Sequence, residues 1–105
     1  MANFMKMMKQ AADMQKNMAK AQEALAALEL EHSAGGGAVR VTITGDGNIT
    51  AIRLDPALVQ GGDVEMLEDL LLTAVRGAQD QARETAATEM KKLTAGLNLP
   101  PGFGL

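Results

Sequence analysis

The sequence has few of the residues from which most active sites are built. It contains no cysteine, no tryptophan and no tyrosine, and its single histidine is His32. Without cysteine, neither a disulfide framework nor a thiolate zinc site is possible, and this composition is compatible with a reducing cytoplasmic location. The only candidate ligands near His32 are Glu29 and Glu31, which argues against a metal site or a histidine-based triad. We therefore expect a protein that is not an enzyme and uses no cofactor, metal or small-molecule substrate.

The remaining polar candidates have simpler interpretations. We expect His32 to be an exposed residue at a strand end, and Glu29 and Glu31 to be solvated carboxylates. The glycine run at residues 35–37 is not followed by Lys-Ser or Lys-Thr and lacks the GxGxxG spacing. It therefore predicts a turn and not a phosphate-binding loop.

Long apolar runs are also absent, since none approaches the roughly 20 residues that cross a bilayer. Charged residues interrupt the first twenty positions, so we interpret this segment as part of the mature fold and not as a targeting peptide. Its apolar residues are mainly Met and Ala, whereas a membrane-surface helix uses bulky Trp, Phe or Leu. We expect no membrane partner.

The charge is distributed unevenly along the chain. The net charge is -3, yet residues 1–22 carry four lysines against one aspartate, while residues 23–105 carry six basic and twelve acidic residues. The positive charge of the opening segment therefore stands apart from an otherwise acidic protein.

The opening segment has the heptad pattern of a packing helix. Apolar residues occupy every a and d position and alternate at spacings of three and four, which predicts an apolar seam along one side. The same numbering puts four lysines at the c and f positions, on the opposite side. This lysine face suits either duplex DNA phosphates or solvent. The seam comprises Phe4, Met7, Ala11, Met14, Met18, Ala21, Leu25 and Leu28, and the lysine face comprises Lys6, Lys9, Lys16 and Lys20.

Period-two alternation replaces the helical pattern after residue 28. Val39, Val41 and Ile43 alternate with polar residues, and glycine-rich turns at 35–37 and 45–48 separate three short strands. We predict an antiparallel meander with one apolar face. Arginines on its polar side are expected to be solvated, as is Arg76 further on.

A second long helix is predicted after residue 62. Asp55-Pro56 opens a short helical turn, and Asp63 is placed to cap a helix that ends near Gly96. Its apolar stripe is Leu67, Leu71, Val75, Ala78, Ala82, Ala86, Met90 and Leu93. The alanines beyond Val75 predict a thin, weakly packing arm. Gly77 in mid-helix indicates either a close backbone approach or a tolerated cost of about 1 kcal/mol.

These elements define an α+β fold in one domain. We expect a helical arm at 1–28, strands at 29–55, a long helix at 63–96 and a flexible tail at 97–105. Helices of about 37 and 48 Å would extend beyond so small a sheet. The sheet cannot cover both apolar stripes, so we expect a two-fold homodimer with projecting helical arms.

Five segments occur in a familiar order over nearly the whole chain: MKMMKQAADMQKNMAKAQEALAALE, SAGGGAVRVTITGDG, IRLDPALV, VEMLEDLLLTAV and LNLPPGF. Together they resemble the YbaB/EbfC family of bacterial nucleoid-associated proteins. The resemblance implies a homodimer whose strands form a joint core and whose helices hold duplex DNA. It also implies a cytoplasmic, nucleoid-associated location and roles in nucleoid organisation and transcription regulation. By position, it implies DNA contacts from Lys6, Lys9, Lys16, Lys20, Arg83, Lys91 and Lys92.

A second hypothesis remains open beside this one. The Ala and Met surfaces of the helices and the Pro100-Pro101 tail would also suit a protein-interaction module or a chaperone-like adaptor. Single-stranded nucleic acid is disfavoured, because readers of unpaired bases usually stack them on aromatic side chains, and the two phenylalanines, Phe4 and Phe103, lie near the termini.

Overall fold

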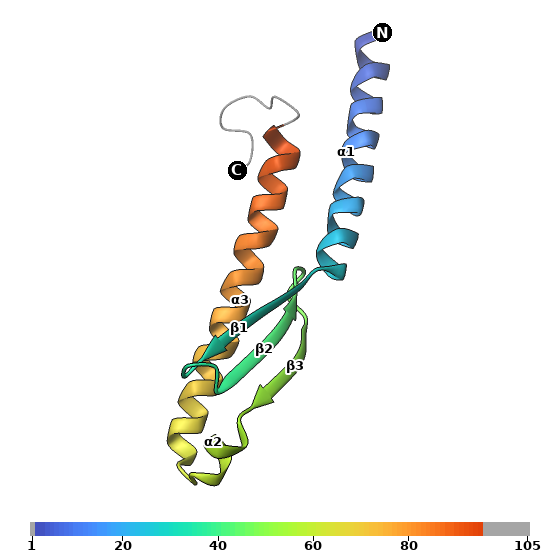
Figure 1. The fold of residues 1–105 in the computed structure, drawn as a ribbon. Helices are drawn as coiled ribbons and strands as arrows, with labels where there is room; N and C mark the ends of the chain where they lie inside the picture. Colours follow the sequence, from blue (N-terminus) through green and yellow to red (C-terminus); the bar gives the residue numbers. More distant parts are fainter. Residues whose placement is uncertain (1, 96–105) are drawn as a thin grey trace.

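The computed structural model describes residues 2–95, with the side chains of residues 3–93. Gly96, expected to end the last helix, and the tail at 97–105 lie outside the described residues. The elements follow in the order α1 (Ala2–Ala27), β1 (Glu29–Ala34), β2 (Val39–Thr44), β3 (Ile49–Leu54), α2 (Pro56–Gln60) and α3 (Val64–Ala95) (Figure 1). The α+β fold class is confirmed: in the sequence, one long helix precedes a three-stranded antiparallel sheet and a second long helix follows it.

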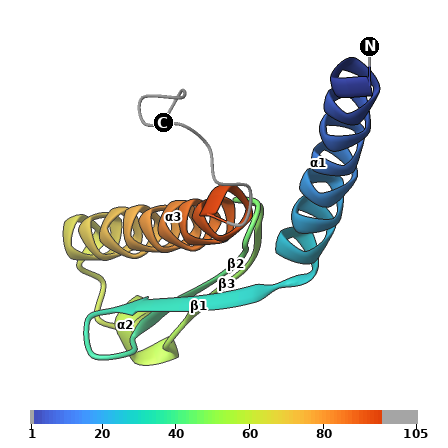
Figure 2. The same ribbon diagram turned by 90° about the horizontal axis from the view of Figure 1, so that it is seen from above.

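The molecule is elongated. Its extents are 71 × 25 × 16 Å and its radius of gyration is 19.8 Å, whereas a compact chain of this length has a radius of gyration near about 13 Å. Figures 1 and 2 show why: α1 and the C-terminal part of α3 leave the same end of the sheet and diverge. The expected projection of both helices is therefore confirmed within one chain.

The sheet has the order β1-β2-β3. Glycines with positive φ angles form the β1–β2 turn at residues 35–37, where a side chain would be strained. In the β2–β3 turn, the backbone N–H of Thr44 donates to the carbonyl of Asn48 at 2.8 Å. The register shifts between Thr42 and Ile43, which leaves Thr50 of β3 as an extra, bulged residue.

One face of the sheet packs against α3 and forms the core. Val39, Val41 and Ile43 of β2 are fully buried. On α3 the buried residues are Ala74, Ala78 and Ala82. The interpretation of the alanine stripe as a thin arm is therefore wrong for Ala78 and Ala82, because their small side chains let the helix lie close to the sheet.

The expectation that His32 is exposed at a strand end is also wrong. His32 lies within β1, pairs with Val41 and is only partly exposed. It faces Gly77 of α3 so closely that a Cβ atom at residue 77 would be 2.1 Å from His32 Nε2. Of the two explanations offered for Gly77, the close approach is correct, although it is made to a side chain and not to a second backbone.

The starts of α2 and α3 both follow the sequence pattern. The Asp55 carboxylate accepts a hydrogen bond from Ala57 N at 3.0 Å, and the Asp63 carboxylate accepts one from Met66 N at 3.0 Å. Each satisfies one N–H group that a helix start leaves without an intrahelical partner. Asp63 thereby fixes where α3 begins.

Candidate nucleic-acid interface

The lysine face of α1, made up of Lys6, Lys9, Lys16 and Lys20, is exposed along its whole length. At 3.6 residues per turn the four side chains fall within an arc of about 80° and span about 21 Å along the helix. No ion pair or hydrogen bond to any of the four is found in the part of the chain that the structure describes. The ammonium groups are thus presented together to solvent.

Asp13 is one of the two acidic residues on α1, the other being Glu23 nearer the end of the helix. On a helical wheel, Asp13 falls within the arc of the lysines, yet it forms no ion pair with them among residues 2–95. The net charge of α1 stays positive at +2, because four lysines stand against two carboxylates.

The three candidates on α3 are placed differently. Arg83 forms an ion pair with Asp80 at 3.3 Å, and Lys92 forms one with Glu89 at 3.2 Å. Lys91 is exposed and has interactions within the chain. These exposed pairs are weak, at about 0–1 kcal/mol, and can exchange. However, residues 80–92 hold three cations and three carboxylates, so this segment is neutral overall.

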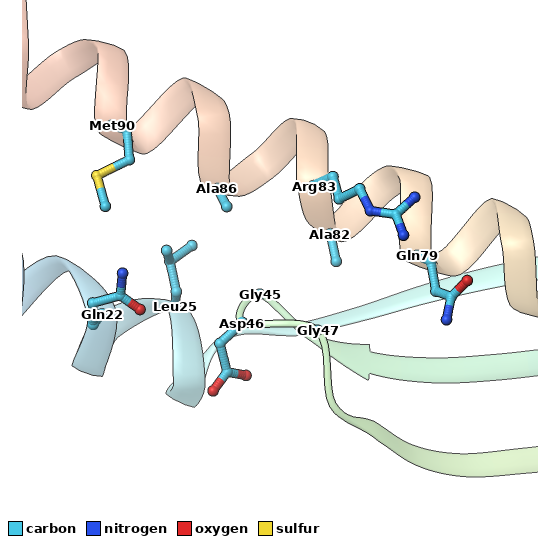
Figure 3. Close-up of a pocket in the computed structure, with 10 residues that line it drawn as sticks. All are labelled: Gln22, Leu25, Gly45, Asp46, Gly47, Gln79, Ala82, Arg83, Ala86 and Met90. Atoms are coloured by element: carbon cyan, nitrogen blue, oxygen red, sulfur yellow. The ribbon is translucent and has the colours of Figure 1, made fainter. Parts of the chain in front are cut away.

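A hollow of about 310 Å³ lies where α1 and α3 diverge. Figure 3 shows Leu25 of α1 pointing towards Ala86 and Met90 of α3, with Arg83 further along α3. Leu25 is 3% exposed and is the one buried residue among residues 3–27 of α1. A Cβ atom at Gly45 would approach the Leu25 carbonyl oxygen to 2.8 Å. This joint fixes the direction in which α1 leaves the sheet, and so sets the geometry of the lysine face.

The sequence pattern did not identify this joint. Leu25 looked like any other seam position, and Gly45 like any other turn glycine. The remaining seam is largely open to solvent in a single chain: Phe4 and Met7 are 63% and 64% exposed. Lys6 and Lys9, on the outer part of α1, are not brought near Arg83, which lies at the base of the arms.

The site offers cations and apolar surface. Among the described residues, no three His, Asp or Glu side chains gather in a way that could hold a metal ion. None of the helices within residues 2–95 is both long and apolar enough to cross a bilayer.

Comparisons with known proteins agree on one family. The model of the YbaB/EbfC DNA-binding family matches residues 1–97. A protein of Akkermansia muciniphila named nucleoid-associated protein is 49% identical over 102 residues, covering 97% of this chain and 98% of that protein. One of Brucella ovis with the same name is 42% identical over 105 residues, covering 100% of this chain and 98% of that protein.

The fold also occurs among solved structures. The crystal structure of an uncharacterized protein from Helicobacter pylori superposes with a TM-score of 0.73. The match covers 90% of this chain and 95% of that one, at 21% sequence identity. At this identity the likeness supports the fold alone.

Proposed function

Because the chain belongs to the YbaB/EbfC DNA-binding family, we propose that it is a nucleoid-associated protein that binds duplex DNA mainly through phosphate contacts from the lysine face of α1. The observation that carries this proposal is the set of four exposed lysines without ion-pair partners among residues 2–95. Their ammonium groups can replace counterions along a phosphate backbone, a mode of binding that reads little sequence. The proposal includes nucleoid organisation and effects on transcription, and it includes no catalytic step.

The α3 cations have a secondary role in this proposal. Arg83, Lys91 and Lys92 lie on the other diverging helix, so they can reach phosphates only if their interactions within the chain are exchanged. The exchange costs little for exposed pairs. The surrounding carboxylates nevertheless oppose an approaching polyanion.

We further propose that the functional unit is a two-fold homodimer. The apolar seam of α1 is mostly exposed, and β3 has an uncovered apolar row made up of Ile49, Ile52 and Leu54. Ile52 pairs with the fully buried Val41 and therefore points to the same side of the sheet, yet it is 47% exposed. Apolar surface of this extent marks an interaction site. A second copy that covers both surfaces would present two lysine faces to one duplex.

The proposal is tested by binding of a plain duplex to the full chain at low salt. Changing Lys6, Lys9, Lys16 and Lys20 to Gln should abolish most of the binding, whereas changing the same residues to Arg should preserve it, since the charge is kept. Retention of full affinity by the Gln variant would exclude the lysine face as the binding surface.

The exposed seam also favours a second candidate function, a protein-interaction module or chaperone-like adaptor. This role would use Phe4, Met7 and their neighbours and would not need the lysines. If the Gln variant performs the cellular role of the wild-type protein, the adaptor hypothesis is supported and DNA binding is not the main function.

A further inference from the structure

Two arginines lie side by side on the polar face of the sheet. Arg40 of β2 and Arg53 of β3 are direct cross-strand partners. Their sequence neighbours Val41 and Ile52 are partners on the opposite, apolar face, so both arginine side chains point away from α3. Like charges in directly opposed positions destabilise a sheet, and this position would favour a residue other than a second arginine on stability alone.

The bulge at Thr50 creates this pairing. Thr44 donates to Asn48 at the turn, and continuing that register along the strands would put Arg40 opposite Ile52. The shift by one residue instead aligns Arg40 with Arg53. Bulges commonly redirect side chains in this way.

The two arginines line a hollow of about 280 Å³ together with Gly37, Leu54 and Asp55. Arg40 Nε donates to the Gly37 carbonyl at 3.3 Å, which holds the guanidinium over the β1–β2 turn. The Arg40 guanidinium also forms a long, exposed ion pair, with Nη1 4.0 Å from Glu31 Oε1. Such pairs contribute little.

Arg53 is less engaged still. Within residues 2–95 its guanidinium makes no hydrogen bond and no ion pair. The nearby Asp55 carboxylate caps α2 by accepting from Ala57 N, and it does not pair with Arg53. The hollow therefore contains two guanidinium groups whose donors are largely unused.

We propose that Arg40 and Arg53 together bind a phosphate group on the polar face of the sheet. A guanidinium presents parallel N–H donors that match a phosphate bidentately. A phosphate has enough oxygens to engage both arginines, whereas a carboxylate is occupied by one. Bound between them, the anion relieves their mutual repulsion. The phosphate belongs either to a nucleic-acid strand or to a free phosphorylated molecule.

This site is separate from the lysine face. It lies at the end of the sheet opposite to the one from which α1 leaves (Figure 1), and α1 alone extends for about 32 Å from Lys6 to Ala27. The proposed phosphate site therefore does not depend on DNA binding by the arms.

The test is an NMR titration of the isotope-labelled full chain with pyrophosphate at low ionic strength. Amide signals of residues 37–40 and 53–55 should shift, and the double variant Arg40→Gln/Arg53→Gln should weaken binding by about tenfold or more. Arg76→Gln, which removes an exposed arginine from α3, is the matched control and should bind as the wild type does. The variant Arg40→Lys/Arg53→Lys keeps the charge but loses the parallel N–H donors of the guanidinium groups. Its affinity for pyrophosphate should lie between those of the wild type and the Gln double variant.

Equal binding by the wild type and the Gln double variant would overturn the proposal, as would an equal loss in the Arg76→Gln control. Duplex binding then identifies the source of the phosphate. If DNA supplies it, the Gln double variant makes the slope of log K against log salt less steep by about 1 to 2. If a free ligand supplies it, pyrophosphate binding is lost while duplex binding is unchanged. A wild type that binds pyrophosphate but no duplex would contradict the proposed function and leave this site intact.

Discussion

The imidazole of His32 occupies the space in which any residue other than glycine at position 77 would place its Cβ atom. The distance from that Cβ position to His32 Nε2 would be 2.1 Å, and those to Cδ2 and Cε1 would be 2.4 and 2.8 Å. The ring lies between β1 and α3, beside the buried Val41, so it would have to shift before a side chain could be accommodated at residue 77. Gly77 is therefore a packing requirement.

This contact predicts a reversal of sign in a double-mutant cycle. Gly77→Ala should lower the free energy of unfolding by about 1–3 kcal/mol, because the added methyl group overpacks the contact. In a His32→Ala background the same change should raise it by up to about 1 kcal/mol, since alanine is the better helix former. Urea unfolding of the four proteins measures both effects. An effect of the same sign in both backgrounds would show that the contact is not as described.

The uncovered apolar row of β3 predicts where dimerisation can be broken. Ile52→Glu should convert the protein from a dimer of twice 11.0 kDa to a monomer of 11.0 kDa, because a carboxylate cannot be buried unpaired in an interface. Sedimentation equilibrium measures the mass. Ser33→Glu, on the polar face of the sheet, is the control and should leave the dimer intact. A wild-type protein that is monomeric at micromolar concentration would contradict the homodimer.

The opposed arginines predict a gain in stability on removing one of them. Arg53→Thr should raise the free energy of unfolding by about 0.2–1 kcal/mol, since it removes a like-charge pair and introduces a residue that favours strands. Salt screens exposed charges, so the electrostatic part of the gain should disappear at about 1 M salt. Thermal unfolding at low and high salt provides the measurement, and a gain that grew with salt would argue against repulsion as its cause.

The two arms should contribute unequally to DNA binding. Replacing Arg83, Lys91 and Lys92 with Gln should weaken duplex binding less than replacing three of the α1 lysines, because α3 is neutral over residues 80–92 and its cations already interact within the chain. Anisotropy titrations of the two triple variants compare them directly. A larger loss of duplex affinity in the α3 variant would show that the main contact surface lies on α3.

Sequence patterns predicted the features that depend on neighbouring residues. Asp63 caps α3 because the N-terminal N–H groups of the helix are within reach of its side chain, and Val39, Val41 and Ile43 share one buried face because strand side chains alternate. The lysine face follows from helical geometry in the same way. Whether those lysines contact DNA remains a prediction.

Features that join distant segments could not be predicted. The contact of His32 with Gly77 depends on how β1 lies beneath α3, and the burial of Ala78 and Ala82 depends on which face of α3 meets the sheet. The alignment of Arg40 with Arg53 depends on a bulge that composition does not reveal. The seam of α1 was recognised as apolar, but a single chain leaves most of it uncovered.

The salt dependence of duplex binding tests the central claim most directly. Affinity should be measured between about 50 and 200 mM salt for the wild type and for the variant with Gln at Lys6, Lys9, Lys16 and Lys20. If about four to six of the eight α1 lysines in a dimer contact phosphates, log K should fall against log salt with a slope of about -4 to -5 in the wild type, and of about -1 or weaker in the variant. A wild-type slope near zero, or the same slope in both proteins, would contradict phosphate binding by the lysine face.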